Sequence, residues 1–269
     1  MPGTAAVSSR WLRRLRNLVG WERLTPFVIY NRIAETTTKR AGRVLYPAHV
    51  AWWNDRSWLA PYSRYLPQPR ILDRRFTLVQ FARAARRLPG STAECGVFTG
   101  VSSALICKTL EGTYGPDAFH FGFDSFEGLS EPGPRDRRPD PATAASAGAR
   151  EVFRGRWRPR DLATSLETAQ ATLAEFTFCR LVKGWIPQSL EPAAGARFRF
   201  VHIDVDLYQP TLDSLAFFYP RLISGGICFF DEYGLLSCLG ARAAVDEFLR
   251  DKPEPIIELA TGQAVLVKG

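Results

Sequence analysis

The sequence predicts an α/β fold, with a seven-stranded, mostly parallel sheet, helices on both faces and an antiparallel hairpin at its C-terminal end. From residue 71 onward, short apolar runs rich in β-branched and aromatic residues alternate with stretches of helical periodicity. This alternation is typical of parallel sheets. The last two apolar runs, 255–259 and 264–268, are separated by only four residues. That gap is too short for a crossover helix, so these runs are expected to form a hairpin.

The elements follow in order from a helical pattern over residues 71–88, which stops at Pro89-Gly90. The predicted strands are 92–97, 119–123, 179–183, 198–204, 227–231, 255–259 and 264–268. The predicted helices lie near 101–110, 162–176, 211–222 and 241–250. Residues 70–269 are therefore expected to form one domain, preceded by a basic helical arm of residues 1–69.

Residues 130–160 interrupt this pattern with a segment rich in Pro, Arg, Gly and Ala. A loop of this length inside a compact domain is usually either functional or disordered. We interpret it as a lid over the substrate, with a solvated insertion as the alternative.

The basic charge is concentrated in the N-terminal arm. Nine Lys and Arg residues but only two acidic residues lie in residues 1–45, so most of the net charge of +8 falls there. Within residues 10–24, apolar side chains recur at helical spacing between arginines. This amphipathic helix is expected to dock on its own domain or on a partner chain, or to contact an anionic membrane surface peripherally. The rest of the chain is close to neutral, which disfavours a nucleic-acid partner.

The composition, with 46% hydrophobic and 23% charged residues, is that of a globular protein. No apolar run of 18 residues indicates a membrane-spanning helix, and the N-terminus does not resemble a secretory signal. The five cysteines are scattered without CxxC spacing, so neither a disulfide framework nor a zinc site is expected. We therefore expect a cytoplasmic location.

The first motif that indicates chemistry is a glycine-containing turn, ECGVFTGVSS, between the first strand and its helix. Glycines allow a tight turn and a close approach to a ligand, and the helix offers free N–H groups at its start. The spacing is not GxGxxG, and the preceding glutamate favours S-adenosylmethionine over a dinucleotide. A purely structural turn is the alternative. The candidate cofactor contacts here are Glu94, Gly96, Thr99, Gly100 and Ser102.

Two further candidate cofactor contacts follow the next strands. Asp124 ends the second strand and is followed by Ser125. An acidic residue at this place can accept hydrogen bonds from both ribose hydroxyls of an adenosine cofactor. Gly184 and Trp185 follow the third strand and are expected at the same sheet edge, near the adenine. Asp124 as a turn residue and Trp185 as a core residue are the alternatives.

Four acidic residues follow the fourth and fifth strands: Asp204, Asp206, Asp231 and Glu232. Neighbouring parallel strands bring their carboxyl ends together, and carboxylates so close repel one another unless a cation or shared protons balance them. Oxygen ligands favour a hard ion such as Mg²⁺. The alternative is that some acids cap helices and others pair with arginines. His202 is interpreted as a packed strand residue, because it has no nearby ligand partner in the sequence.

Taken together, AECGVFTGVSS, GFDSFEGL, LVKGWIPQSL, HIDVDLYQPT, FFDEYG and AVDEF resemble the macrocin O-methyltransferase (TylF-type) family over roughly residues 70–250. The resemblance implies a Rossmann-like class I methyltransferase fold and a homodimer. It also implies transfer of a methyl group from S-adenosylmethionine to a hydroxyl of a small-molecule or glycan acceptor, such as a sugar in a natural product or polysaccharide. By match, Asp204, Asp231 and Glu232 hold Mg²⁺ and Asp206 is the general base. The family often has Asp-Asp where this chain has Asp231-Glu232, and the arm and the 130–160 segment do not match.

Two other functions stay open at this point. The DxD sequence after a strand also occurs in metal-dependent glycosyltransferases, although these do not need the adenosine site predicted upstream. A non-catalytic module that docks on anionic membranes through the basic arm is the second alternative.

Overall fold

The computed structural model describes residues 51–55, 57–66, 71–136 and 157–269, which belong to two units, 1–58 and 59–269. The described part of the first unit contains helix α3 (Ala51–Asn54) and the start of the 3-10 helix η2 (Ser57–Tyr62). The predicted amphipathic helix of residues 10–24 and the centre of the predicted lid, residues 137–156, lie outside the described residues.

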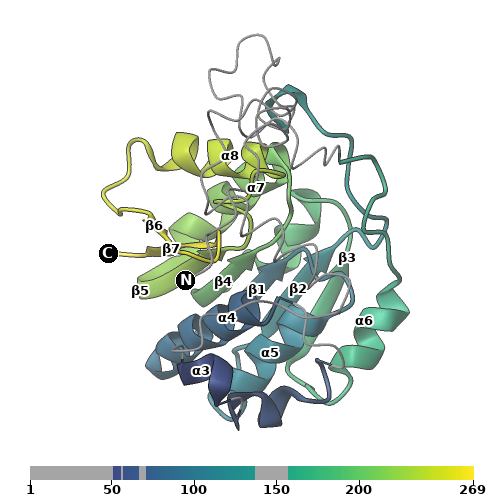
Figure 1. Ribbon diagram of the computed structural model, residues 1–269, viewed down its shortest axis with the longest axis vertical. Coiled ribbons are helices and arrows are strands. Elements are labelled where there is room, and N and C mark those ends of the chain that lie inside the picture. Colours follow the sequence, from purple (N-terminus) through teal and green to yellow (C-terminus); the bar gives the residue numbers. More distant parts are fainter. Residues whose placement is uncertain (1–50, 56, 67–70, 137–156) are drawn as a thin grey trace, which may run out of the picture. The chain divides into compact units, whose positions relative to one another are not determined.

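The second unit contains a seven-stranded sheet in the order β3-β2-β1-β4-β5-β7-β6 (Figure 1). Strand β7 pairs antiparallel with both β5 and β6, and all other pairs are parallel. The predicted mostly parallel sheet with a C-terminal hairpin is therefore confirmed. The strands are β1 (Ser91–Cys95), β2 (His120–Asp124), β3 (Cys179–Lys183), β4 (Phe198–Ile203), β5 (Leu222–Phe230), β6 (Ile257–Glu258) and β7 (Ala264–Val267).

The helices connect these strands as the periodicity predicts. The α-helices are α4 (Leu72–Ala84), α5 (Val101–Leu110), α6 (Leu166–Leu173), α7 (Tyr208–Phe218) and α8 (Leu239–Leu249). The 3-10 helices are η3 (Ala85–Arg87), η4 (Pro134–Asp136), η6 (Gln188–Ala193) and η7 (Tyr219–Arg221). None of the helices within the described ranges is long and apolar enough to cross a membrane.

Strand β5 begins five residues before its predicted start. The Ser224-Gly225-Gly226 sequence is typical of a turn, but the strand passes through it with a shift in register against β4. Gly225 adopts a φ of +75°, and its N–H still donates to the carbonyl of Lys268 at 2.8 Å. This glycine irregularity keeps the first half of β5 hydrogen-bonded to Lys268, the residue that follows β7.

The two faces of the sheet differ in chemistry, because successive side chains of a strand point to opposite faces. The face covered by α7 and α8 is apolar, and Phe123 of β2 contacts Phe218 of α7 there. The face covered by α4 and α5 carries buried polar side chains as well, among them Glu94, His120 and His202. The candidate site lies at the carboxyl ends of the strands that carry these polar side chains.

Candidate functional site

The carboxyl ends of five neighbouring strands form one row at a single edge of the sheet, and backbone hydrogen bonds join each strand end to the next. This row brings most of the predicted site residues together, as expected for parallel strands. The bonded pairs, donor first, are Gly184 and Asp124 (2.9 Å), Gly96 and Phe123 (2.8 Å), Asp204 and Cys95 (2.9 Å), and Asp231 and Ile203 (3.0 Å).

A cavity of about 390 Å³ lies at this edge. Its walls include seven residues that the sequence singled out: Gly96, Asp124, Ser125, Gly184, Trp185, Asp204 and Asp206. The other predicted site residues do not line it, and these are Glu94, Thr99, Gly100, Ser102, Asp231 and Glu232. Gly100 and Ser102 lie at the start of helix α5, and Asp231 and Glu232 lie beside the cavity residue Asp204.

Gly96 sits where the chain turns away from β1, with a φ of +87°. A Cβ atom at this position would come within 1.8 Å of the carbonyl oxygen of Asp204. Only glycine fits a backbone conformation of this kind with so close a neighbour. The turn after β1 and the end of β4 are therefore packed directly against each other.

The carboxylate of Asp124 ties two loops of the cavity wall together. It accepts hydrogen bonds from the backbone N–H of Phe98 (2.8 Å) and of Phe126 (2.6 Å). Phe98 has a positive φ of 51°, lines the cavity and is 44% exposed. An exposed aromatic ring in a sparsely populated backbone conformation is a feature of binding sites. Phe98 was not predicted as a site residue, although an aromatic residue inside a glycine turn is a usable signal.

Glu94, predicted to contact the cofactor, points into the buried interface between the sheet and α5. It is fully buried and accepts a hydrogen bond from Nδ1 of His202 at 2.7 Å, and the Ser103 hydroxyl donates to its other oxygen. Ser103 also contacts Nε2 of His120 at 3.0 Å. Its hydrogen bonds therefore place Glu94 in a buried polar network behind the cavity wall.

The acid cluster, defined as Asp204, Asp206, Asp231 and Glu232, carries unequal charge. Burial and the neighbouring Asp231 carboxylate raise the pKa of Asp204 to about 7. Burial likewise raises the pKa of Asp206 to about 6 and that of Glu232 well above its usual range. Burial would also raise the pKa of Asp231, but His202 and Arg74 outweigh it and hold that pKa below its ordinary value.

Arg74, from the first turn of α4, supplies part of the counter-charge. Its guanidinium donates to both the carbonyl oxygen (2.7 Å) and the carboxylate of Asp231, and to Oε1 of Glu232 at 3.1 Å. Pairing with arginine, which the sequence left open, therefore applies to two of the four acids. Gln263, next to β7, also donates to the Asp231 carboxylate. Neither residue was predicted, because each comes from an element distant in sequence.

The donor set around Asp204 suits a divalent cation even with Arg74 in place. Ligand atoms of His202, Asp204 and Asp231 lie within 4.8 Å of one another. His202 is fully buried in β4, as predicted, but its Nε2 has no hydrogen-bond partner and lies 3.6 Å from Asp231 Oδ1. Burial raises the pKa values of Asp204 and Glu232, and Asp231 and Glu94 raise the pKa of His202 to about 10 despite its burial. Clustered carboxylate oxygens are what hard ions prefer, and such an ion would displace protons from this cluster.

Asp206 is, with Asp204, one of the two acid-cluster residues that line the cavity. Its φ is +60°, its side chain is mostly buried, and the Cys238 thiol donates to Oδ1 at 3.3 Å. Asp136, in the 130–160 segment, caps the following helix α7 by accepting from the Tyr208 N–H at 2.7 Å. This cap fixes the start of α7 beside Asp206.

Comparison with known proteins places this geometry in a family. The family model described as Macrocin-O-methyltransferase (TylF) matches residues 74–262. An 8-demethyl-8-(2,3-dimethoxy-alpha-L-rhamnosyl)-tetracenomycin-C 4'-O-methyltransferase from Streptomyces olivaceus is 30% identical over 165 residues, which is 60% of this chain and 58% of that protein. The mycinamicin III 3''-O-methyltransferase from Micromonospora griseorubida is 28% identical over 61% of this chain and 62% of that protein. The chain thus spans less than two thirds of the length of these relatives.

Solved structures agree at the level of the fold. The calicheamicin methyltransferase CalS11 has a TM-score of 0.58 at 22% identity, over 92% of this chain and 95% of that chain. The O-methyltransferase NovP has a TM-score of 0.57 at 22% identity, over 72% of this chain and 79% of that chain. The comparisons lend no support to the glycosyltransferase alternative. Since the family model matches more than half of the sequence, the protein belongs to the macrocin O-methyltransferase (TylF) family.

Proposed function

We propose that this protein is an O-methyltransferase that moves the methyl group of S-adenosylmethionine to a sugar hydroxyl of a natural product or polysaccharide. The observation that carries the proposal is one cavity in which Gly96 and Asp124 lie together with Asp204 and Asp206. A site for an adenosine cofactor and a site for activating a hydroxyl then share one space. The relative from Streptomyces olivaceus is named as a methyltransferase of a rhamnosyl compound, which supports a sugar acceptor.

The cofactor is assigned to the wall formed by the ends of β1, β2 and β3. Each oxygen of the Asp124 carboxylate accepts one backbone N–H and keeps a lone pair that a ribose hydroxyl can use. Trp185, 43% exposed, and Gly184 stand beside Asp124 for contact with the adenine. The Gly96 turn lines the cavity with main-chain atoms, which allows the methionine part of the cofactor to approach the backbone closely.

Asp206 is proposed as the general base. It removes the proton of the acceptor hydroxyl while the oxygen forms a bond to the methyl carbon and the carbon–sulfur bond breaks, leaving S-adenosylhomocysteine. A pKa near 6 leaves its carboxylate ionised at neutral pH and still basic enough to take a proton. Asp204, Asp231 and Glu232 would hold Mg²⁺, which when bound lowers the pKa of the hydroxyl and fixes the position of its oxygen.

The described ends of the 130–160 segment support its role as a lid over the acceptor. Leu129 and Leu162 line the cavity, and the chain is pinned where the segment begins and ends. The N–H of Arg160 donates to the carbonyl of Leu129, and the N–H of Leu129 donates to the carbonyl of Asp161, both at 2.9 Å. These hydrogen bonds hold the two ends of the segment in place, so the residues between them can differ with the acceptor while the cavity keeps its shape.

Three further parts of the proposal concern binding partners and the location of the protein in the cell. Peripheral contact of residues 10–24 with an anionic membrane surface, a homodimer and a cytoplasmic location all remain predictions. Vesicle flotation with and without residues 1–45 tests the first, and sedimentation velocity tests the second.

The test of the function is calorimetric titration of S-adenosylmethionine into the wild type, Asp124→Ala and the control Asp117→Ala, each with and without Mg²⁺. Asp117 is an exposed residue before β2, outside the cavity. We expect micromolar binding that Asp124→Ala loses and Asp117→Ala keeps. Sugar-bearing acceptors, including rhamnosides, are then screened by mass spectrometry for the gain of one methyl group. No binding by the wild type under any condition would overturn the proposal.

A further inference from the structure

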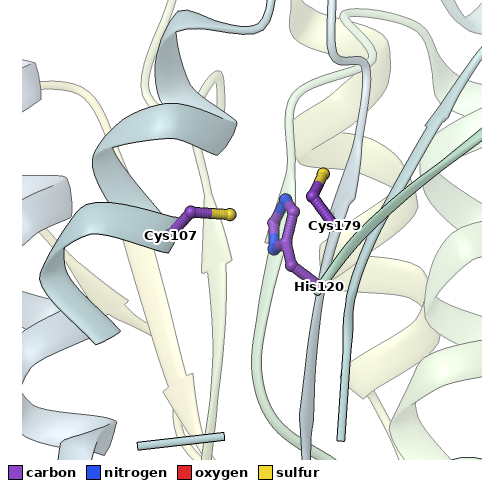
Figure 2. Close-up of side chains that lie close together, drawn as sticks. All are labelled: Cys107, His120 and Cys179. Carbon is purple, nitrogen blue, oxygen red and sulfur yellow. The ribbon is translucent and has the colours of Figure 1, made fainter. Parts of the chain in front are cut away.

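Two cysteines and a histidine from three separate elements meet inside the second unit, away from the acid cluster. Cys107 comes from α5, His120 from the start of β2 and Cys179 from the start of β3. His120 and Cys179 are register partners on adjacent strands, so their side chains project from the same face of the sheet. Figure 2 shows the Cys107 sulfur pointing toward the His120 ring, with the Cys179 sulfur on the other side of the ring in this view.

The distances among these side chains are close to those of a metal site. One ligand atom from each residue lies within 4.8 Å of the other two. Tetrahedral zinc with sulfur ligands at 2.3 Å would set its sulfurs about 3.8 Å apart. Side-chain adjustments of about 1 Å would therefore bring the three ligand atoms to bonding distance of one ion.

The surroundings of His120 suit a ligand. Its Nδ1 contacts the Thr92 hydroxyl at 2.8 Å and its Nε2 contacts the Ser103 hydroxyl at 3.0 Å. When one ring nitrogen binds an ion, the other keeps its hydroxyl partner, which is the arrangement that orients histidine ligands in proteins. Complete burial lowers the pKa of His120 to about 4, so the ring is neutral at pH 7.

The chemistry of the three ligands selects the class of ion. Two thiols and an imidazole favour thiophilic ions such as Zn²⁺, Cd²⁺ and Cu⁺ over Mg²⁺. Cys107 and His120 are fully buried, whereas Cys179 is partly exposed and provides a route for entry from solvent. His120 begins the strand that Asp124 ends, which sets the cluster about 13 Å from the cavity edge. We propose that Cys107, His120 and Cys179 form a second metal site, specific for a thiophilic ion and separate from the acid cluster.

Cadmium titration of the full-length, phosphine-reduced protein tests the proposal, because thiolate bound to Cd²⁺ absorbs in the ultraviolet and carboxylate does not. We expect the band to saturate at one ion per chain. Cys107→Ala and Cys179→Ala should each lose most of the band, and competition with a chromophoric chelator should show at least tenfold weaker Zn²⁺ binding. His120→Asn should weaken Zn²⁺ binding similarly while both thiols remain.

The controls separate this site from other causes. Cys228→Ala removes a buried cysteine of β5 outside the cluster and should keep the full band, as should Asp204→Asn in the acid cluster. Thermal unfolding identifies any variant that fails to fold. Cys179→Ala should disturb folding least, because Cys179 is only partly buried. Two results would each overturn the proposal: no band in the wild type, or an undiminished band in Cys179→Ala.

Discussion

Replacing Glu94 by glutamine tests whether this residue binds cofactor, as its place in the motif predicts, or stabilises the fold, as its contacts indicate. Glu94→Gln keeps the shape of the side chain but exchanges one acceptor oxygen for an NH₂ donor. Because Ser103 and His202 each donate to a different oxygen of Glu94, one of them then faces a donor. A hydrogen bond to a charged group contributes about 1.5–3 kcal/mol, and a buried donor left unsatisfied costs about 1–3 kcal/mol.

The expected loss of unfolding free energy is therefore about 2.5–6 kcal/mol, measured by urea denaturation with an unchanged m-value. Affinity for S-adenosylmethionine, measured by calorimetry on the folded variant, should change by less than about threefold, which is under 1 kcal/mol. Glu111→Gln is the matched control, because this exposed carboxylate pairs with Lys108 at 2.8 Å on the surface and should cost no more than about 0.5 kcal/mol. The reasoning would be refuted if Glu94→Gln unfolded like the wild type but bound cofactor more than tenfold more weakly.

Three other substitutions have clear expected outcomes. Gly96→Ala should cost at least about 3 kcal/mol by urea unfolding, because its Cβ would collide with the Asp204 carbonyl oxygen; a wild-type midpoint would contradict this. Arg74→Gln leaves two buried carboxylates without their cation and should cost about 3–5 kcal/mol in chelator but less in Mg²⁺, so an equal loss of thermal stability in both would argue against a cation there. Burial alone would raise the pKa of Glu254, but hydrogen bonds from Lys268 and from Tyr219, the first residue of η7, outweigh it and lower it to about 2. Its stabilisation is full above pH 4.5 and is lost as the pH falls toward 2, so Glu254→Gln should flatten the fall in urea midpoint between pH 5 and pH 3.

The matched control for the glycine substitution is Gly195→Ala, because a Cβ atom there has no neighbour within 4 Å. It should change the urea midpoint little, and a loss as large as that of Gly96→Ala would point to a general effect of alanine rather than to the collision.

The sequence predicted the fold and the strand-end residues because both depend on local patterns. Apolar runs mark the strands, and residues that end parallel strands meet at one edge whatever the details of packing. Contacts across the fold depend instead on register and helix placement, which local sequence does not encode. This explains why Arg74 was missed and why Glu94, at a motif position, was assigned to the cavity although its side chain faces α5. The absence of CxxC spacing also hid the meeting of Cys107 and Cys179, which depends on the pairing of β2 with β3 and on the packing of α5 against β2.

The contact between Gly96 and Asp204 has a consequence for how the protein can evolve. Asp204 donates its N–H to Cys95, and no side chain separates its carbonyl from the glycine turn. The spacing between the glycine turn and Asp204, which follows β4 two residues before the proposed base Asp206, is thus set by main-chain atoms. Substitutions that suit a new acceptor can then alter other side chains of the cavity wall without moving these two strand ends relative to each other.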